Sequence, residues 1–236
     1  MVSIIIPSYN SQEFIEETIE SAIKQSIVNE VIVIDDNSTD KTFEIVKRCA
    51  HPKLSVIQNK RNMGLAYNIN TCVKMIKNEY FIILGHDDIL PDNFVEKGMG
   101  LLLRSNSDFL FCNSVIIDSF GNKNLLMYSD FAQKIKFCFP KIFLCLGNFI
   151  NSCGTIQTKK AFMKIGGYDE SYFMSGEYLY WIKASSLFNF KYTSSIKSLY
   201  RVHSKNITKS LQKTNSQYIE ICRQAAIKNL FCFLKS

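Results

Sequence analysis

The sequence predicts an α/β fold in which a mostly parallel sheet is flanked by helices. Short β-branched runs alternate with segments whose apolar residues recur every three or four positions, and this alternation is typical of strand–helix–strand units. Polar residues follow directly after several of these runs, as expected where parallel strands end at a ligand crevice. A hydrophobic content of 47% over 236 residues is enough for one large core.

The expected elements follow one another in chain order. In the first half we expect strands at 2–6, 30–34, 54–58 and 80–84, with helices at 11–26, 40–49 and 65–77 between them. In the second half we expect strands at 109–117 and 191–202, helices at 160–166 and 177–187, and a final amphipathic helix at about 216–234. The segment 131–150 is rich in aromatic residues and shows no clear period.

Cysteine usage and the N-terminal residues favour a cytoplasmic protein. The eight cysteines are scattered through apolar runs without paired spacing, so we expect reduced thiols. No leader peptide precedes the first strand, and no run reaches the ~20 apolar residues of a membrane span.

The positive charge of the chain is concentrated at its C-terminal end. The net charge is +7, from 28 basic and 21 acidic residues, and 197–236 contains eight of the basic residues and one acidic residue. Such a tail predicts an anionic neighbour, either a membrane or an acidic polymer, and we expect peripheral contact with an anionic membrane rather than with nucleic acid. Packing of the tail on the body is the alternative. The segment 137–149 is likewise open between core and acceptor or membrane contact.

Three polar clusters are expected to meet at one edge of the sheet. They are Tyr9-Asn10, Asp35 to Ser38, and Gly85 to Asp88. Each alone is compatible with a turn or a helix cap. In the third cluster, Asp87 and Asp88 follow a buried strand and would repel each other unless a cation such as Mg²⁺ or Mn²⁺ neutralises them. A solvated loop in which Asp88 caps the next turn is the alternative.

The motifs, taken in order, resemble those of glycosyltransferase family 2. Any one of them is weak, whereas the ordered set is specific and covers residues 1 to about 205. They are Val-Ser-Ile-Ile-Ile-Pro-Ser-Tyr-Asn at the start, Val-Ile-Val-Ile-Asp-Asp-Asn-Ser-Thr-Asp at 31–40, Asn-Met-Gly-Leu-Ala at 62–66, Leu-Gly-His-Asp-Asp at 84–88, Gly-Gly-Tyr-Asp-Glu at 166–170, Gly-Glu-Tyr-Leu-Tyr-Trp at 176–181 and Tyr-Arg-Val-His at 200–203.

This resemblance implies a GT-A fold. It implies a nucleotide-sugar-binding half at 1–112 that is continuous with an acceptor-binding half at 113–205, followed by the basic tail at 206–236. The nucleotide pocket would be lined by Pro7, Tyr9, Asp36 (facing the base), Arg61, Asn62 and Asp87 (near the ribose).

The resemblance also assigns the metal site. Asp88 would bind Mn²⁺ or Mg²⁺. Arg201 and His203 would approach the diphosphate, His203 as a metal ligand or a phosphate contact. The sequence has Gly85 where many family members carry a further aspartate, so the site would depend heavily on Asp88.

The catalytic base is expected just before the tryptophan of the later motif. Family members usually carry Glu-Asp there, whereas this chain has Gly176-Glu177, so Glu177 takes the position of the base. The alternative is that Glu177 only stabilises the first turn of a helix. Asp169 and Glu170 are the fallback bases.

The function implied by the resemblance is inverting transfer of a sugar from a nucleotide-sugar, with UDP-sugar as the default donor. The acceptor would be a hydroxyl group of a saccharide or lipid-linked saccharide in surface polysaccharide or oligosaccharide assembly. Two alternatives remain at this point: a non-catalytic nucleotide-sugar-binding protein, suggested by the two departures from the family motifs, and a transferase acting on polyprenyl phosphate. The sequence predicts no oligomeric state.

Overall fold

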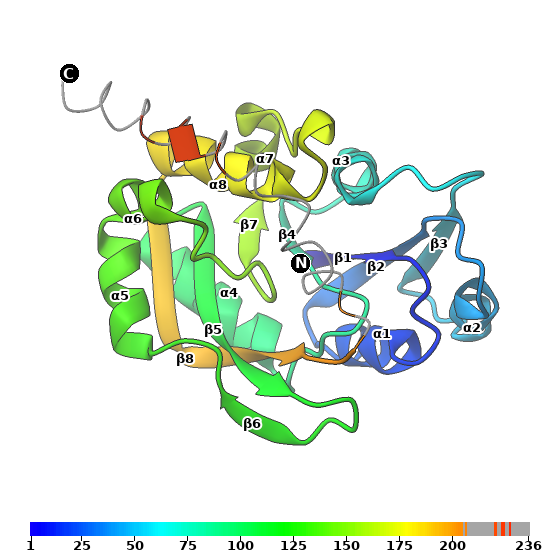
Figure 1. Ribbon diagram of the computed structural model, residues 1–236. Coiled ribbons are helices and arrows are strands. Elements are labelled where there is room, and N and C mark those ends of the chain that lie inside the picture. Colours follow the sequence, from blue (N-terminus) through cyan, green and yellow to red (C-terminus); the bar gives the residue numbers. More distant parts are fainter. Residues whose placement is uncertain (205, 207–219, 221–222, 225–226, 228–236) are drawn as a thin grey trace.

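The computed structural model describes residues 1–204, 206, 220, 223, 224 and 227, without the side chains of 173–175. These residues build one mixed sheet of eight strands with helices packed against its two faces (Figure 1). The expected helix at about 216–234 falls almost wholly outside the described residues.

The first four strands form the parallel part of the sheet. β1 pairs in parallel with β2 and β4, and β2 pairs in parallel with β3. β7 is antiparallel to both β4 and β5, so the parallel pattern ends there, while β5 and β8 pair in parallel. The sheet order is β3-β2-β1-β4-β7-β5-β6, with β8 on β5. The strands are β1 Val2–Ser8, β2 Val28–Asp35, β3 Leu54–Gln58, β4 Tyr80–Ile83, β5 Phe109–Ile117, β6 Lys123–Leu126, β7 Ile156–Thr158 and β8 Phe190–Arg201.

The helices connect these strands and cover the sheet. None of them, within the described part of the chain, combines the length and apolar character needed to cross a bilayer. They are α1 Ile15–Ile23, α2 Thr42–Arg48, α3 Leu65–Met75, α4 Phe94–Ser105, α5 Asp130–Cys138, α6 Pro140–Leu146, α7 Lys159–Ile165 and α8 Gly176–Leu187, with a 3₁₀ helix η1 at Glu170–Ser175.

Alternation along the strands divides the core into two clusters, one on each face of the sheet. Ile4 and Ile6 of β1 pack with α1 and α4, whereas Ile5 packs with α3, α7 and α8. Because successive strand residues point to opposite faces, a strand buried on both faces carries a continuous apolar run, as β1 does at Ile4, Ile5 and Ile6. The boundary expected at residue 112 lies inside β5, so one sheet runs through both expected halves.

The cysteines that the structure describes are free thiols. Burial raises the pKa of Cys72 to about 12 and that of Cys112 to about 11, which keeps both thiols protonated and unreactive at neutral pH.

Candidate active site

Loops from four parallel strands meet at one edge of the sheet, as expected from the polar clusters. Asn10, after β1, donates its backbone N–H to Ser38 Oγ (2.9 Å) and accepts at Oδ1 from the backbone N–H of Thr39 (2.8 Å). His86, after β4, has Nδ1 3.3 Å from the Pro7 carbonyl oxygen. The convergence of the three clusters is therefore confirmed, and Pro7 itself is buried at the end of β1.

Tyr9, Arg61 and Asn62 stand at the rim of this edge. Tyr9 is 37% exposed, and Arg61 and Asn62 are exposed in the loop between β3 and α3. Their side chains are open to a ligand, and nucleotide binding by these three residues stays a prediction.

The carboxylate of Asp36 forms hydrogen bonds within the protein. Its carboxylate accepts hydrogen bonds from the backbone N–H groups of Met63 and Gly64 (both 2.8 Å) and from Asn59 Nδ2 (2.8 Å). A carboxylate at the first turn of a helix is favoured because it satisfies free N–H groups there. The residue expected to face the base thus fixes the start of α3 and the loop that carries Arg61 and Asn62.

Asp87 is held by residues that come from the far end of the chain. Its Oδ2 atom lies 3.0 Å from His203 Nε2 and accepts a hydrogen bond of 3.1 Å from Asn206 Nδ2. The ring of His203 in turn packs 4.7 Å from that of Phe14. The structure therefore brings the two predicted residues Asp87 and His203 into direct contact.

Asp88 is buried beside Asp87, with 4% of its surface exposed. Burial and the neighbouring charge of Asp87 raise the pKa of Asp88, while hydrogen bonds from the Arg201 backbone N–H (3.0 Å) and from Cys153 partly offset this. A Cβ atom at Gly85 would lie 2.7 Å from Asp88 Oδ2 and 3.1 Å from Asp87 Oδ1. Two carboxylate oxygens therefore flank the space that a side chain at residue 85 would fill.

Arg201 differs from the expectation. Only 1% of it is exposed, because its guanidinium donates to the carbonyl oxygens of Asp87 (2.9 Å) and of residues 118 and 119 and to Glu17 Oε2 (2.6 Å). The guanidinium carbon also lies 4.9 Å above the Phe14 ring. The predicted phosphate contact is not supported by this geometry: Arg201 is a buried clamp that holds the backbone of Asp87 and Asp88 in place.

Glu177 lies in the first turn of α8, as predicted. Its Oε1 atom accepts a hydrogen bond from Trp181 Nε1 (3.1 Å), one helical turn further on. Burial raises the pKa of Glu177, and hydrogen bonds from Ser152 and Trp181 offset part of that rise. A partly exposed carboxylate with a raised pKa is a stronger base than an ordinary glutamate and is suited to accept a proton from a substrate.

One loop lies between the predicted catalytic base, Glu177, and the predicted metal ligand, Asp88. Ser152 lies beside Glu177, and the next residue, Cys153, lies beside Asp88. Ser198 secures this loop by donating its hydroxyl to the Cys153 carbonyl oxygen (2.9 Å). Neither Ser152 nor Cys153 is recognisable from the sequence, because their partners lie far along the chain.

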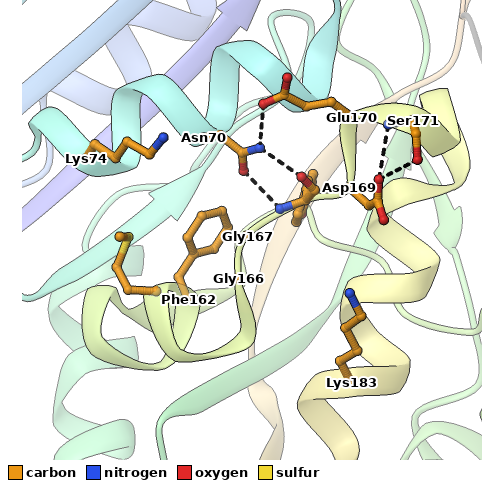
Figure 2. Close-up of a pocket in the computed structure, with 11 residues that line it drawn as sticks. Asn70, Lys74, Phe162, Gly166, Gly167, Asp169, Glu170, Ser171 and Lys183 are labelled. Atoms are coloured by element: carbon orange, nitrogen blue, oxygen red, sulfur yellow. Dashed lines mark hydrogen bonds between the residues drawn. The ribbon is translucent and has the colours of Figure 1, made fainter.

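Asn70 of α3 holds the segment that leads to Glu177 (Figure 2). Its Nδ2 atom donates to the Tyr168 carbonyl oxygen (2.8 Å) and to Glu170 Oε1 (3.0 Å), and its Oδ1 atom accepts from the Tyr168 backbone N–H (2.9 Å). A Cβ atom at Gly167 would lie 2.5 Å from Asn70 Oδ1, so this close approach requires glycine. The Asp169 carboxylate bonds Ser171 in the same segment, so both fallback bases are engaged locally.

Replacing Asn70 by aspartate is expected to loosen this segment. The substitution removes a donor and places an acceptor against the Tyr168 carbonyl oxygen and the Glu170 carboxylate, which costs about 1–3 kcal/mol. We expect a lower melting temperature and a lower kcat with donor affinity unchanged, measured by thermal unfolding, turnover and titration with UDP. Lys74→Gln, one turn along α3, is the control. Unchanged turnover in Asn70→Asp would contradict a positioning role.

Comparison with known proteins agrees with this geometry. The family model described as "Glycosyl transferase family 2" matches residues 3–165. The chain belongs to this family. A protein described as an uncharacterized glycosyltransferase of Rickettsia typhi is 32% identical over 224 residues, which are 92% of this chain and 69% of that protein.

Two further similar proteins come with functional descriptions of their own. The Escherichia coli protein WfgD, described as a UDP-Glc:α-D-GlcNAc-diphosphoundecaprenol β-1,3-glucosyltransferase, is 33% identical over 50% of this chain and 47% of WfgD. The E. coli protein WfaP carries the same description and is 24% identical over 97% of this chain and 88% of WfaP.

Solved structures confirm the expected GT-A fold. S. aureus TarS 1–349 in complex with UDP-GlcNAc superposes with a TM-score of 0.73 at 21% identity, over 89% of this chain and 60% of that chain. The mannosyltransferase PcManGT from Pyrobaculum calidifontis, in complex with GDP-Man and Mn²⁺, gives a TM-score of 0.67 at 17% identity, over 87% and 58% of the two chains.

Proposed function

We propose that this family 2 glycosyltransferase transfers a sugar, with inversion, from a UDP-sugar to a hydroxyl group of a lipid-linked saccharide during surface polysaccharide or oligosaccharide assembly. One observation carries the proposal: two successive residues of one loop lie beside Glu177, a partly exposed carboxylate of raised pKa, and beside Asp88, a carboxylate at the edge where the parallel strands end. Sugar transfer of this kind needs a general base for the acceptor hydroxyl and a carboxylate that binds the cation. The descriptions of WfgD and WfaP supply the donor and the class of acceptor.

The residues around Asp88 fit a divalent cation in part. Asp88 Oδ2 and Asp87 Oδ1 flank the space above Gly85, and the imidazole of His203 lies against Asp87. Among the described residues no group of three or more His, Cys, Asp and Glu side chains is arranged to hold a metal ion by itself. This suits Mg²⁺ or Mn²⁺, which typically take one or two carboxylates from the protein and further ligands from substrate phosphates.

In the proposed reaction the residues of this chain have separate tasks. Glu177 accepts the proton of the acceptor hydroxyl as that oxygen attacks the anomeric carbon from the face opposite the nucleotide, which inverts the configuration. Asp87, fixed by His203 and Asn206, would face the ribose, and Asp88 would hold the cation, while Arg201 holds the backbone of Asp87 in place. When bound, the cation offsets the charge that develops on the leaving diphosphate.

A methyl group at residue 85 is expected to disturb the cation site without disturbing the fold. In Gly85→Ala the new Cβ meets both carboxylates, so they must move apart. We expect the affinity for UDP in the presence of Mn²⁺ to fall about tenfold or more, as for other changes next to metal ligands. Calorimetric titration measures this. Gly100→Ala in α4, where the nearest atom is Arg104 Nη2 at 3.6 Å, is the control. Equal affinity for UDP in both variants would contradict the site.

A panel of nucleotide-sugars tests the proposed function. Each donor is incubated with the protein, with Mn²⁺ or with a chelator, and with GlcNAc-diphosphoundecaprenol as acceptor, and both binding and release of the nucleoside diphosphate are scored. We expect release from a UDP-sugar that depends on the acceptor and on the cation. Binding without release under any condition would instead favour the non-catalytic reading. Transfer to polyprenyl phosphate alone would favour the other alternative.

A further inference from the structure

Helices α5 and α6 carry large apolar side chains that are exposed rather than packed in the core. Both lie at the outer side of the acceptor half, next to β8 and away from β1–β3 (Figure 1). Their inward residues, such as Phe137 and Leu144, are buried, which resolves part of the segment 137–149 as core. Phe131 and Ile135 lie one turn apart on α5, and Ile142 and Leu146 lie one turn apart on α6, with Phe139 between the two helices. These exposed residues are what we call the apolar stripe: Phe131 (75% exposed), Ile135 (41%), Phe139 (57%), Ile142 (49%) and Leu146 (69%).

Positive charge accompanies the apolar stripe. Lys134, Lys136 and Lys141 lie on the same two helices, and Asp130 is the one acidic residue between positions 130 and 146. The carboxylate of Asp130 is already engaged, because it pairs with Lys197 Nζ (3.3 Å) and accepts from Tyr192 (2.7 Å). The surface therefore offers exposed aromatic and aliphatic side chains among lysines, which is the combination that binds anionic lipid surfaces.

The apolar stripe continues into a groove. A cavity of about 740 Å³ opens between the start of α6 and the turn from α8 into β8, and it is lined by Phe139, Ile142, Leu187 and Phe188 among others. Of these, Leu187 is 52% exposed and extends the apolar surface beyond α6. Large exposed apolar patches bordered by polar residues are typical of interaction sites in soluble proteins.

The inner side of the same helices leads to the proposed base. The Tyr178 hydroxyl, next to Glu177 in α8, donates to the Leu144 carbonyl oxygen of α6. The chain that leaves α6 reaches Ser152, which lies beside Glu177. Helices α5 and α6 therefore carry the apolar stripe on their outer side, and on their inner side they contact the segments next to Glu177.

We propose that the apolar stripe of α5 and α6 is a membrane-docking surface that inserts into anionic bilayers. The purpose of this docking, which is delivery of a lipid-linked acceptor to the side of the site where Glu177 lies, rests on the proposed function; the binding itself does not. The apolar stripe overlaps the segment 137–149, one of the two segments for which the sequence left membrane contact open, and it does not include the other, the basic tail at 206–236.

Vesicle co-sedimentation of the full chain tests this surface. The vesicles contain phosphatidylcholine alone or phosphatidylcholine with phosphatidylglycerol. We expect binding to the anionic vesicles, and a partition coefficient reduced about tenfold or more in the double variant Phe131→Ser with Phe139→Ser. Lys134→Glu should weaken binding several-fold, about as expected for one charge reversed near a lipid surface. Leu103→Ser in α4, where Leu103 is 62% exposed, is the matched control and should bind as the wild type does.

Three outcomes would overturn the proposal. The first is absence of vesicle binding by the wild type. The second is wild-type binding by the phenylalanine double variant together with loss of binding in Arg223→Glu, which would assign the contact to the tail. The third is a wild-type dimer in light scattering that the double variant disperses while no vesicles are bound, which would make the apolar stripe an interface with a second copy.

A soluble assay separates this proposal from the proposed function. Transfer to a water-soluble acceptor glycoside should be equal in the wild type and the phenylalanine double variant, because neither residue touches the site. Vesicle binding without any transfer would sustain the docking surface and refute the proposed function. Transfer without vesicle binding would sustain the proposed function and refute the docking surface.

Discussion

Glu177→Gln is expected to lower kcat about a thousandfold, since loss of a general base typically costs 10²–10⁴-fold. The amide keeps the size of the side chain and an oxygen that can accept from Trp181, so the helix start should be preserved. Donor affinity, measured by titration with UDP, should be unchanged because Glu177 acts on the acceptor. Glu170→Gln is the matched control and should retain near-normal kcat, because glutamine keeps the side-chain oxygen that accepts a hydrogen bond from Asn70. Wild-type rates in Glu177→Gln would contradict the assignment.

The dependence of kcat on pH gives a second test of Glu177 as the base. Burial raises the pKa of Glu177, so the inactive protonated form persists to higher pH than for an exposed glutamate. We therefore expect kcat to rise as pH increases through this raised pKa and to level off above it. The residual activity of Glu177→Gln should lack that rise. A profile that is flat from the ordinary pKa of glutamate upward in the wild type would contradict the role of Glu177 as base.

Asp88→Asn is expected to reduce kcat/KM by about two to three orders of magnitude, as for other groups that stabilise developing charge. Asparagine keeps the acceptor for the Arg201 backbone N–H, so the fold should survive. The substitution removes the charge that holds the cation, so Mn²⁺ should no longer strengthen UDP binding, which calorimetry measures without turnover. Asp169→Asn, outside the cation site, is the control. Mn²⁺-dependent UDP binding that persists unchanged in Asp88→Asn would contradict the assignment.

The sequence was sufficient to predict the parallel half of the fold. Strands β1 to β4 are β-branched runs that end at polar clusters, and their carboxyl ends meet because parallel strands share one direction. Helices α4, α5 and α6 and strands β6 and β7 were not predicted. β7 has only three residues, Ile156–Thr158, and is defined by pairing with β4 and β5, which no local pattern records.

The sequence predicted the positions of site residues better than it predicted which of their side chains are buried and bound to other parts of the protein. Glu177 and the pair Asp87–Asp88 were placed by their position after strands and before a tryptophan, and the structure puts them where that order requires. For Arg201, the sequence shows a positive charge but does not show that four protein oxygens accept hydrogen bonds from its guanidinium, so its contact with phosphate stays a prediction. Asn70 was not predicted because its partners lie almost a hundred residues away in the chain.

The configuration of the transferred sugar tests the central claim most directly. The product formed from an α-linked UDP-sugar can be examined by NMR at its anomeric proton, using the donor and acceptor that the panel identifies. If Glu177 activates the acceptor for a single attack opposite the diphosphate, the product must be the β-anomer. An α-linked product would contradict the account.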